Sequence, residues 1–275
     1  MIVIAHLSDT HLDNTPRSTE RARAVMAYLE ALPYDLDAVL VTGDIADHGR
    51  PAEYELSRRV LASRHPVFLC PGNHDVRTAF RKVLLDGGST EAEGREGEPV
   101  NRIHRTRKAV FLLCDSTIPG QDDGRLDDGT LGWLASALRE TRDEGLPVFV
   151  AFHHPPVDLH TPPIDAIRQS GEHRLAGLVA DAPHVVAFLC GHAHTAAATT
   201  FAGRPLLVAP GVVSTVRLPW EYGAAEEEFV DHRLPPALAF HVLGDDGRLT
   251  THYRTVPTDG HAGASGASGA ESGAA

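Results

Sequence analysis

The sequence predicts an α/β protein in which layered sheets are flanked by helices. The first two thirds of its 275 residues alternate short apolar runs, typical of strands, with longer segments typical of helices. The last third holds almost only strand-like runs, and layered sheets with flanking helices fit this order. Hydrophobic residues make up 42% of the chain, so one large domain, or at most two small ones, can build a sizeable core.

Strands are predicted where short apolar runs rich in β-branched residues end at turn-forming residues. These runs are residues 2–7, 37–42, 66–70, a hairpin over 101–106 and 108–115, and then 146–152, 184–190, 196–201, 205–209, 237–243 and 249–256. Helices are predicted at residues 18–32, 53–62, 76–85, 130–144 and 172–180. The first helix has Ser18 or Thr19 as its cap and apolar side chains on one face.

Two polar stretches interrupt this pattern. Residues 87–99 are acidic and poor in apolar side chains, which predicts a mobile loop. Residues 258–275 are rich in Gly, Ala and Ser without any periodicity, which predicts a disordered tail. We therefore expect one domain over residues 1–257, followed by the tail.

Charge and cysteine content narrow the class of function. The formal net charge of −12 at pH 7 argues against a nucleic acid polymer as partner, because nonspecific binding to one needs a basic surface. Cys70, Cys114 and Cys190 each lie in an apolar run, and their odd number argues against a disulfide framework. Since no signal peptide or membrane-spanning run is visible either, we expect a cytoplasmic protein.

Five short motifs follow predicted strands, and each offers side chains that bind metal ions: Asp9-Thr10-His11, Gly43-Asp44, Gly72-Asn73-His74-Asp75, His153-His154 and Gly191-His192-Ala193-His194. Any one of them alone is more simply a surface turn or a helix cap. Five together, each after a strand, are hard to obtain by chance, and sites form at the carboxyl ends of strands. The donors are nitrogen and oxygen without a thiolate, which favours Mn, Fe, Zn or Co.

In order and spacing, the five motifs resemble the signature blocks of calcineurin-like metallophosphoesterases, and the resemblance spans about residues 2–256. It implies a four-layer α/β/β/α sandwich with two divalent metal ions at the edge of the sheets. The implied ligands are Asp9, His11 and His194 for one ion, Asn73, His153 and His192 for the other, and Asp44 as the bridge. The family's ligand corresponds to His153 rather than to His154.

The resemblance also implies catalytic residues. His74 would lie beyond the metal ions, contact the phosphate and donate a proton to the leaving oxygen. Asp75 would orient His74, although a carboxylate here also fits the start of a helix. Asn73 and His194 would contact the phosphate together with His74.

Within the superfamily the motifs are closest to class III cyclic nucleotide phosphodiesterases and glycerophosphodiesterases. Ser/Thr protein phosphatases carry arginines where His48 and Pro71 stand, and purple acid phosphatases carry tyrosine where Asp47 stands. The expected substrate is thus a small phosphodiester, such as cAMP or a glycerophosphodiester. A broad phosphomonoesterase, a nuclease and a non-catalytic metal-binding scaffold are the alternatives.

Substrate contacts are harder to predict. The segment 158–173 lies between two of the motifs and should overhang the site. Arg168 and His173 could meet a second phosphate substituent there, although both also fit an ordinary surface segment. Residues 220–222 and 226–228 could form a lid or a subunit contact, as in a homodimer.

Overall fold

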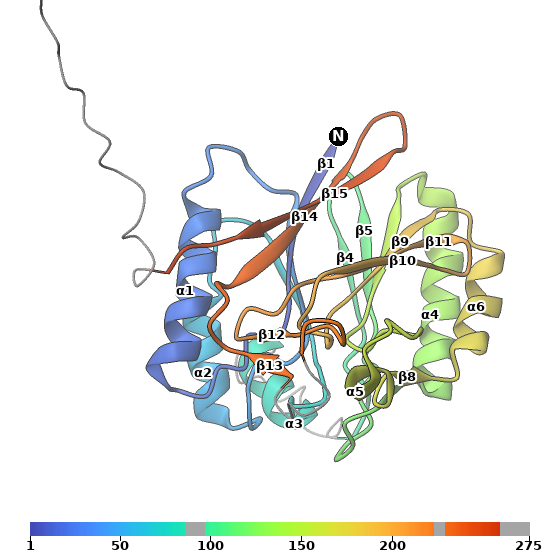
Figure 1. Ribbon diagram of the computed structural model, residues 1–275. Coiled ribbons are helices and arrows are strands. Elements are labelled where there is room, and N and C mark those ends of the chain that lie inside the picture. The colour runs from blue at the N-terminus through green and yellow to red at the C-terminus, as the bar shows by residue number, and fades with distance from the viewer. Residues whose placement is uncertain (86–96, 223–228, 259–275) are drawn as a thin grey trace, which may run out of the picture.

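The computed structural model describes residues 1–85, 97–222 and 229–258. Two sheets lie face to face, and helices cover the outer face of each (Figure 1). The first sheet has the strand order β15-β14-β1-β2-β3, and the second has the order β10-β11-β9-β7-β5-β4. The expected four-layer α/β/β/α sandwich is confirmed.

Each sheet contains a run of neighbouring parallel strands. The first sheet consists of β1 (Ile2–Leu7), β2 (Ala38–Thr42), β3 (Val67–Cys70), β14 (Ala237–Leu243) and β15 (Leu249–Thr255). The second consists of β4 (Arg102–Arg105), β5 (Val110–Leu113), β7 (Val148–Ala151), β9 (Val185–Cys190), β10 (Ala197–Phe201) and β11 (Arg204–Val208). β1, β2 and β3 are parallel, as are β5, β7, β9 and β11. Their carboxyl ends therefore leave each sheet on one side, where sites form.

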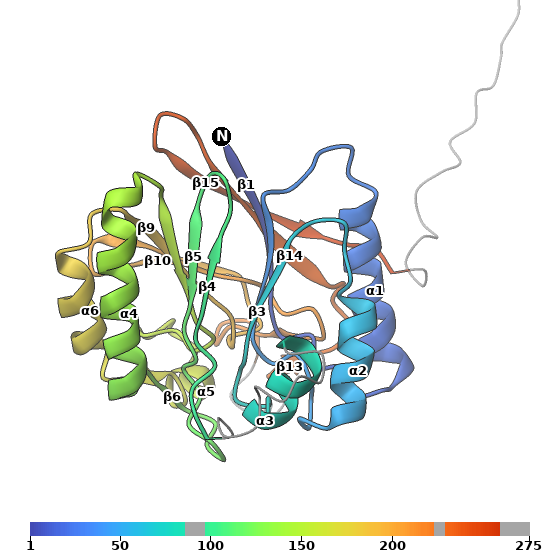
Figure 2. The same ribbon diagram turned by 180° about the vertical axis from the view of Figure 1, so that it is seen from behind.

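Helices cover the two outer faces, as the two views show (Figures 1 and 2). α1 (Pro16–Glu30) and α2 (Pro51–Val60) cover the first sheet, and α4 (Asp128–Thr141) and α6 (Glu172–Ala180) cover the second. Shorter elements are α3 (Arg77–Phe80) with a π-helix over Arg81–Leu85, a 3-10 helix over Arg142–Glu144, and α5 (Pro162–Asp165). Within the described ranges, every helix is too short or too polar to cross a membrane.

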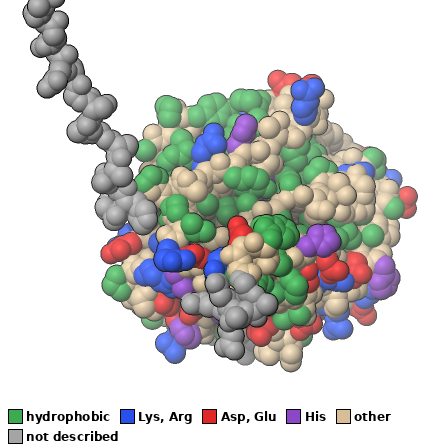
Figure 3. Space-filling model, in the orientation of Figure 1, with side chains coloured by type: hydrophobic (Ala, Val, Ile, Leu, Met, Phe, Trp, Pro, Cys, Tyr) green, Lys and Arg blue, Asp and Glu red, His purple; other side chains and the backbone are tan. Residues whose placement is uncertain are grey.

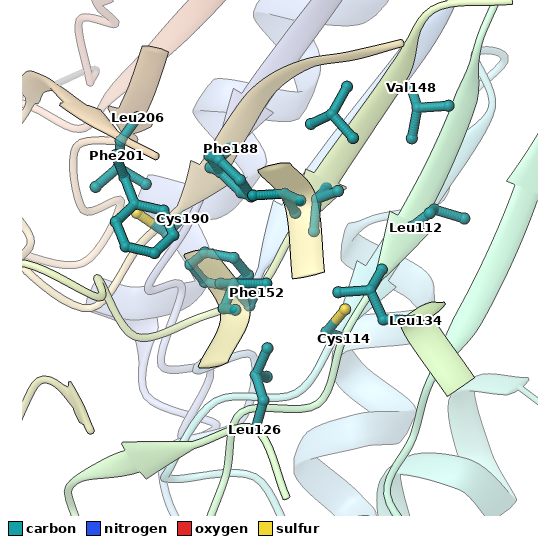
Figure 4. Close-up of a cluster of buried hydrophobic side chains, with 14 of the residues drawn as sticks. Leu112, Cys114, Leu126, Leu134, Val148, Phe152, Phe188, Cys190, Phe201 and Leu206 are labelled. Atoms are coloured by element: carbon teal, nitrogen blue, oxygen red, sulfur yellow. The ribbon is translucent and has the colours of Figure 1, made fainter. Parts of the chain in front are cut away.

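Side chains alternate between the two faces of each strand, and this alternation builds the core. Ile2 and Ile4 of β1 pack between the sheets, whereas Leu7 packs under α1 and α2. Phe111 of β5 likewise packs between the sheets, whereas Leu112 packs with α4 and α6. Figure 4 shows this outer cluster. Burying one such Leu or Phe side chain contributes about 1.5–3 kcal/mol.

The predicted strands and helices are present, with shifted ends. The helix predicted to begin at residue 18 begins at Pro16, and α2 begins at Pro51 rather than at residue 53. Proline suits the first turn of a helix because it has no N–H to satisfy. The helix predicted over 76–85 has a four-residue α-helical start and then widens into the π-helix.

The sequence analysis missed two small sheets, and parts of three predicted segments lie outside the described residues. Two small sheets, β6 (Gly124–Arg125) with β8 (Gln169–Ser170) and β12 (Thr215–Val216) with β13 (Val230–Asp231), are too short for a sequence signal. Most of the loop predicted over 87–99, residues 226–228 and the tail from residue 259 lie outside the described residues.

Candidate metal centre

Loops that follow strands of both sheets are tied together at one edge of the molecule. Between the loops after β1 and β2, His11 N donates to Asp44 O (2.9 Å). His192 N, after β9, donates to Asp9 Oδ2 (3.2 Å), and His74 N, after β3, donates to Asp44 Oδ1 (2.9 Å). Motifs that are far apart in the sequence therefore share one small volume.

Four predicted ligands form a first cluster, with donor atoms within 4.8 Å of one another: Asp9, His11, Asp44 and His194. His11 Nε2 lies 3.3 Å from His194 Nε2 and 3.5 Å from Asp44 Oδ2. His194 Nε2 lies 3.4 Å from Asp9 Oδ1. Two imidazole nitrogens and two carboxylates thus face a common centre.

The remaining predicted ligands form a second cluster around His153. His153 Nε2 lies 3.1 Å from Asn73 Oδ1 and 3.2 Å from His192 Nδ1. It also lies 3.3 Å from Asp44 Oδ2. Asp44 Oδ2 therefore faces both clusters, which is the position expected of a bridging carboxylate.

The outer nitrogen of three of these imidazoles is held by a hydrogen bond. His11 Nδ1 lies 2.8 Å from Asp47 Oδ1, His194 Nδ1 lies 2.8 Å from Ser214 Oγ, and His153 Nδ1 donates to the carbonyl oxygen of Thr42 (2.7 Å). Such partners fix the ring and direct the other nitrogen inward. Sequence reasoning did not single out these three partners as anchors, because nothing local marks Ser214 or Thr42.

His154 is held differently, which supports the choice of His153. His154 also lies near His153 and His192. However, its Nε2 donates to the carbonyl oxygen of Asp122 (3.2 Å), and its Nδ1 lies 2.8 Å from Ser116 Oγ. Both ring nitrogens are therefore engaged away from the clusters.

The carboxylates of the centre favour the protonated form of the buried His153 imidazole. Burial alone would lower the pKa of His153, but Asp44 and Asp9 outweigh it and raise the pKa to about 9. Burial would raise the pKa of Asp44, but His153 and His11 hold it well below its usual range. A metal ion binds the unprotonated imidazole and would displace this proton.

Asp9 provides the observation that tests whether cations fit. Its Oδ1 is buried and has no hydrogen-bond partner in the described part of the chain. A buried carboxylate oxygen in this state is costly unless it faces a cation. The donor set of carboxylates, imidazoles and one amide oxygen also suits divalent ions. The residues therefore fit the pair of divalent ions that the resemblance implies.

Backbone strain concentrates at the predicted ligands. Positive φ angles, rare outside glycine, occur at Asp9 (56°), His11 (40°), Asp44 (49°), His192 (67°) and His194 (52°). Each costs on the order of 1–3 kcal/mol and persists only where the surroundings impose it. Gly72 is required for a different reason, because a Cβ there would collide with the Asp44 carboxylate.

The expected contact between Asp75 and His74 is absent, and that prediction was wrong. The buried Asp75 carboxylate accepts hydrogen bonds from a tyrosine hydroxyl and three backbone N–H groups: Tyr54 Oη (3.0 Å), Ile45 N (3.1 Å), Ala46 N (3.1 Å) and Gly72 N (2.9 Å). Its oxygens are thus occupied in joining the loops after β2 and β3. Asp47 orients His74 instead, through its carbonyl oxygen 2.8 Å from His74 Nδ1.

Arg168 and His173 are not brought to either cluster by the described contacts. Arg168 Nε donates to Asp158 Oδ1 (2.6 Å) within its own segment, and His173 is exposed on α6. The segment reaches the centre through other atoms, because the backbone of Ile167 lies against the imidazole of His192. The substrate contacts of Arg168 and His173 stay predictions.

Comparison with known proteins agrees with this geometry. A profile of the calcineurin-like phosphoesterases matches residues 2–196. The chain is 33% identical over 223 residues to the glycerophosphodiester phosphodiesterase GpdQ of Enterobacter lignolyticus, covering 78% of this chain and 79% of that protein. It is 29% identical over 263 residues to the 3′,5′-cyclic adenosine monophosphate phosphodiesterase CpdA of Escherichia coli, covering 92% and 89%.

A solved structure shares the fold. A dimetal phosphatase from Danio rerio superposes with a TM-score of 0.66 at 16% identity, and the match covers 93% of this chain and 99% of that chain. At this identity the similarity concerns the fold alone, which agrees with the four layers seen here.

Proposed function

This chain belongs to the calcineurin-like phosphoesterase family, and on that premise we propose that it is a metal-dependent phosphodiesterase acting on small phosphodiesters. The observation that carries the proposal is the position of Asp44 Oδ2, 3.5 Å from His11 Nε2 and 3.3 Å from His153 Nε2. One carboxylate oxygen facing two sets of nitrogen ligands is what a two-metal hydrolytic centre requires.

We assign the ligands as two sets that share one residue. Asp9, His11 and His194 would hold the first ion, Asn73, His153 and His192 would hold the second, and Asp44 would be shared by both. Nitrogen and oxygen donors without a thiolate favour Mn, Fe, Zn or Co as the pair. When bound, two such cations supply positive charge to the phosphoryl oxygens and lower the pKa of water.

His74 is the proposed proton donor. Its Nδ1 donates to the carbonyl oxygen of Asp47 (2.8 Å), which leaves Nε2 to serve an oxygen of the substrate. Its ring lies edge-on to His11, with 4.5 Å between the ring centroids, so it borders the first cluster. We propose that His74 acts as an imidazolium that keeps the proton on Nδ1 and gives the proton on Nε2 to the departing alkoxide, and that Asn73 and His194 contact the phosphate beside it.

The substrate class follows from the relatives. GpdQ is named for glycerophosphodiesters and CpdA for cyclic adenosine monophosphate. We propose that this chain hydrolyses one of these classes, a 3′,5′-cyclic nucleotide such as cAMP or a glycerophosphodiester. Both are small diesters with one negative charge at the phosphate, which the cations would neutralise.

A substrate panel tests the proposal. The chain is loaded with Mn²⁺ and assayed with bis-p-nitrophenyl phosphate and p-nitrophenyl phosphate, and then with cyclic nucleotides and glycerophosphodiesters. We expect the diester to be preferred in kcat/KM by about tenfold or more, a transition-state difference of about 1.4 kcal/mol. A preference for the monoester would instead identify a phosphomonoesterase, and no turnover with two bound ions would identify a scaffold.

Three broader assignments also stay proposals. We propose a reducing compartment, the cytoplasm, because Cys70, Cys114 and Cys190 are buried free thiols. We propose one catalytic domain over residues 1–257, which limited proteolysis would test. We propose a homodimer, with exposed Trp220 as a candidate contact, which sedimentation velocity would test.

A further inference from the structure

A cavity of about 270 Å³ opens beside the first cluster. His11 and His194 form one side of it, and the apolar Val213 and Val230 form part of its wall. It is slightly smaller than the roughly 300–1,000 Å³ typical of small-molecule sites. A substrate whose phosphate lies over the clusters would therefore extend a small alcohol group into this cavity.

Arg17, on the first turn of α1, lines the same cavity, and no described side chain pairs with its charge. Among the described residues no hydrogen bond or ion pair engages its guanidinium. The two acids of the lining are occupied elsewhere: Asp13 Oδ1 lies 2.9 Å from Thr15 N, and Asp47 Oδ1 lies 2.8 Å from His11 Nδ1. The positive charge of Arg17 is thus available to a ligand.

Arg21 lies one helical turn further along α1 and adds a second guanidinium group close to Arg17. It also holds the segments that form the wall of the cavity. Burial, and then the charge of Arg17, lower the pKa of Arg21, so the two guanidinium groups act on each other. Arg21 donates to Val212 O (2.8 Å) and to Leu234 O (2.7 Å), which ties down the segments on either side of the cavity. Arg17 and Arg21 therefore place two positive charges near the cavity, whose lining also holds the carboxylates of Asp13 and Asp47.

The rest of this face carries both signs of charge. Figure 3 shows acidic, basic and histidine side chains mixed along the lower part of this face. His232 also lines the cavity, together with His11 and His194. The cavity therefore combines apolar side chains with imidazole groups, the carboxylates of Asp13 and Asp47 and the guanidinium of Arg17.

We infer that Arg17 binds a second oxyanion on the alcohol group of the substrate, so that the site prefers phosphodiesters of small alcohols bearing a carboxylate or a phosphate. The inference rests on the proposed function, because the first oxyanion is the phosphate held at the two clusters. A guanidinium fork matches the paired oxygens of either group. Since Arg17 is exposed, the preference weakens as salt is added.

Four chromogenic diesters test this preference. All share 4-nitrophenol as the leaving group, and the second alcohol is ethylene glycol, glycolate, 2-hydroxyethyl phosphate or choline. At low salt, wild type should show about tenfold higher kcat/KM for the glycolate or phosphate diester than for the glycol diester, the scale of one charged hydrogen bond. The ratio of kcat/KM between the glycolate diester and the phosphate diester shows which oxyanion is preferred.

Two variants locate the effect. Arg17→Gln should bring the ratio of anionic to neutral diester close to one, and Arg17→Lys should retain part of it. Arg23→Gln is the matched control, because Arg23 is exposed on the same helix and does not line the cavity. An unchanged ratio in Arg17→Gln, or an equal loss in Arg23→Gln, overturns the inference.

A binding measurement separates this inference from the proposed function. Calorimetric titration of the Mn²⁺-loaded chain with phosphoglycolate and with 2-hydroxyethyl phosphate requires no turnover. About tenfold tighter binding of phosphoglycolate, lost in Arg17→Gln, supports the inference even where no diester is hydrolysed. Hydrolysis without any preference that depends on Arg17 overturns the inference and leaves the phosphodiesterase assignment in place.

Discussion

His153 in the metal centre and His6 in β1 are both fully buried, yet their partners shift their protonation in opposite directions. His153 lies 3.3 Å from the Asp44 carboxylate, and its pKa is raised to about 9 against the effect of burial. His6 Nδ1 lies 2.9 Å from His241 Nε2, and burial and then His241 hold its pKa well below the usual value. Burial alone therefore does not decide the charge of a histidine in this fold.

The two sites also differ in whether their polar atoms are satisfied. In the His6 pair, the outer nitrogens lie 2.9 Å from Thr42 Oγ1 and from Thr251 Oγ1, so each ring nitrogen has a partner. In the metal centre, Asp9 Oδ1 is buried without a hydrogen-bond partner among the residues that the structure describes. A hydrogen-bond network in which every polar atom has a partner, as in the His6–His241 pair, stabilises the sheet. A site with a buried polar atom that has no partner is instead suited to a ligand.

The largest expected effect comes from removing the carboxylate shared by the two clusters. Asp44→Ala should lose both metal ions and lower kcat/KM for bis-p-nitrophenyl phosphate by about 10³-fold or more, the scale of losing a main electrostatic stabiliser. Asp35→Ala is the control, because that side chain is 87% exposed. Metal content by mass spectrometry and initial rates check this, and full loading with full activity would disprove the bridging role.

Replacing His74 should separate chemistry from metal binding. We expect His74→Ala to lower turnover by about 10²-fold or more, as for loss of a general acid, with two metal equivalents retained. His74 also lies with His11 and Asp47 in a third group of donor atoms. Metal loss that parallels the loss of rate would therefore show that His74 is a ligand rather than a proton donor.

Replacing one histidine of the His6–His241 pair should affect stability and not catalysis. His241→Leu leaves His6 Nδ1 buried without its partner, which should cost about 1–3 kcal/mol in the free energy of unfolding. His241→Gln keeps a polar group there and should cost less. Urea denaturation measures both, and a drop in kcat at full metal loading would contradict the purely structural role of the pair.

The smallest expected effect is a loss of folding stability at acid pH, which comes from His241 of the same pair. Burial lowers the pKa of His241 in the folded chain to about 3 from its usual 6.5. The unfolded chain then binds more protons below pH 6.5, so stability that is present above this pH is lost as pH falls toward 3. Between pH 6.5 and 5.5 the loss is about 1 kcal/mol for His241.

The variant His241→Gln separates the pH dependence of stability that comes from His241 from the pH dependence that comes from the carboxylates. Urea denaturation of wild type and of His241→Gln at pH 6.5 and pH 5.5 gives two changes in the free energy of unfolding. We expect wild type to lose about 1 kcal/mol more than the variant. Equal losses would mean that His241 is not held neutral by its surroundings.

Much of the candidate site was predictable because metal ligands belong to specific residue types in specific places. All seven predicted ligands follow a strand, and the structure brings all seven into two adjoining clusters. The anchors of the imidazoles were not predictable, because Thr42 acts through a backbone carbonyl and Ser214 lies in an unmarked loop. Asp75 was misread because its carboxylate accepts hydrogen bonds from Tyr54 and from backbone N–H groups rather than from the adjacent His74 side chain.

The sequence by itself determined the elements, the α/β class and the residue types of the centre, because strand periodicity and donor chemistry are local properties. Only the tertiary structure decided which atoms face one another. The left-handed backbone at the ligands, the position of Asp44 Oδ2 between two imidazoles and the place of Arg17 in the cavity lining all depend on how distant loops pack. Packing is a property of the whole chain, and no window of the sequence contains it.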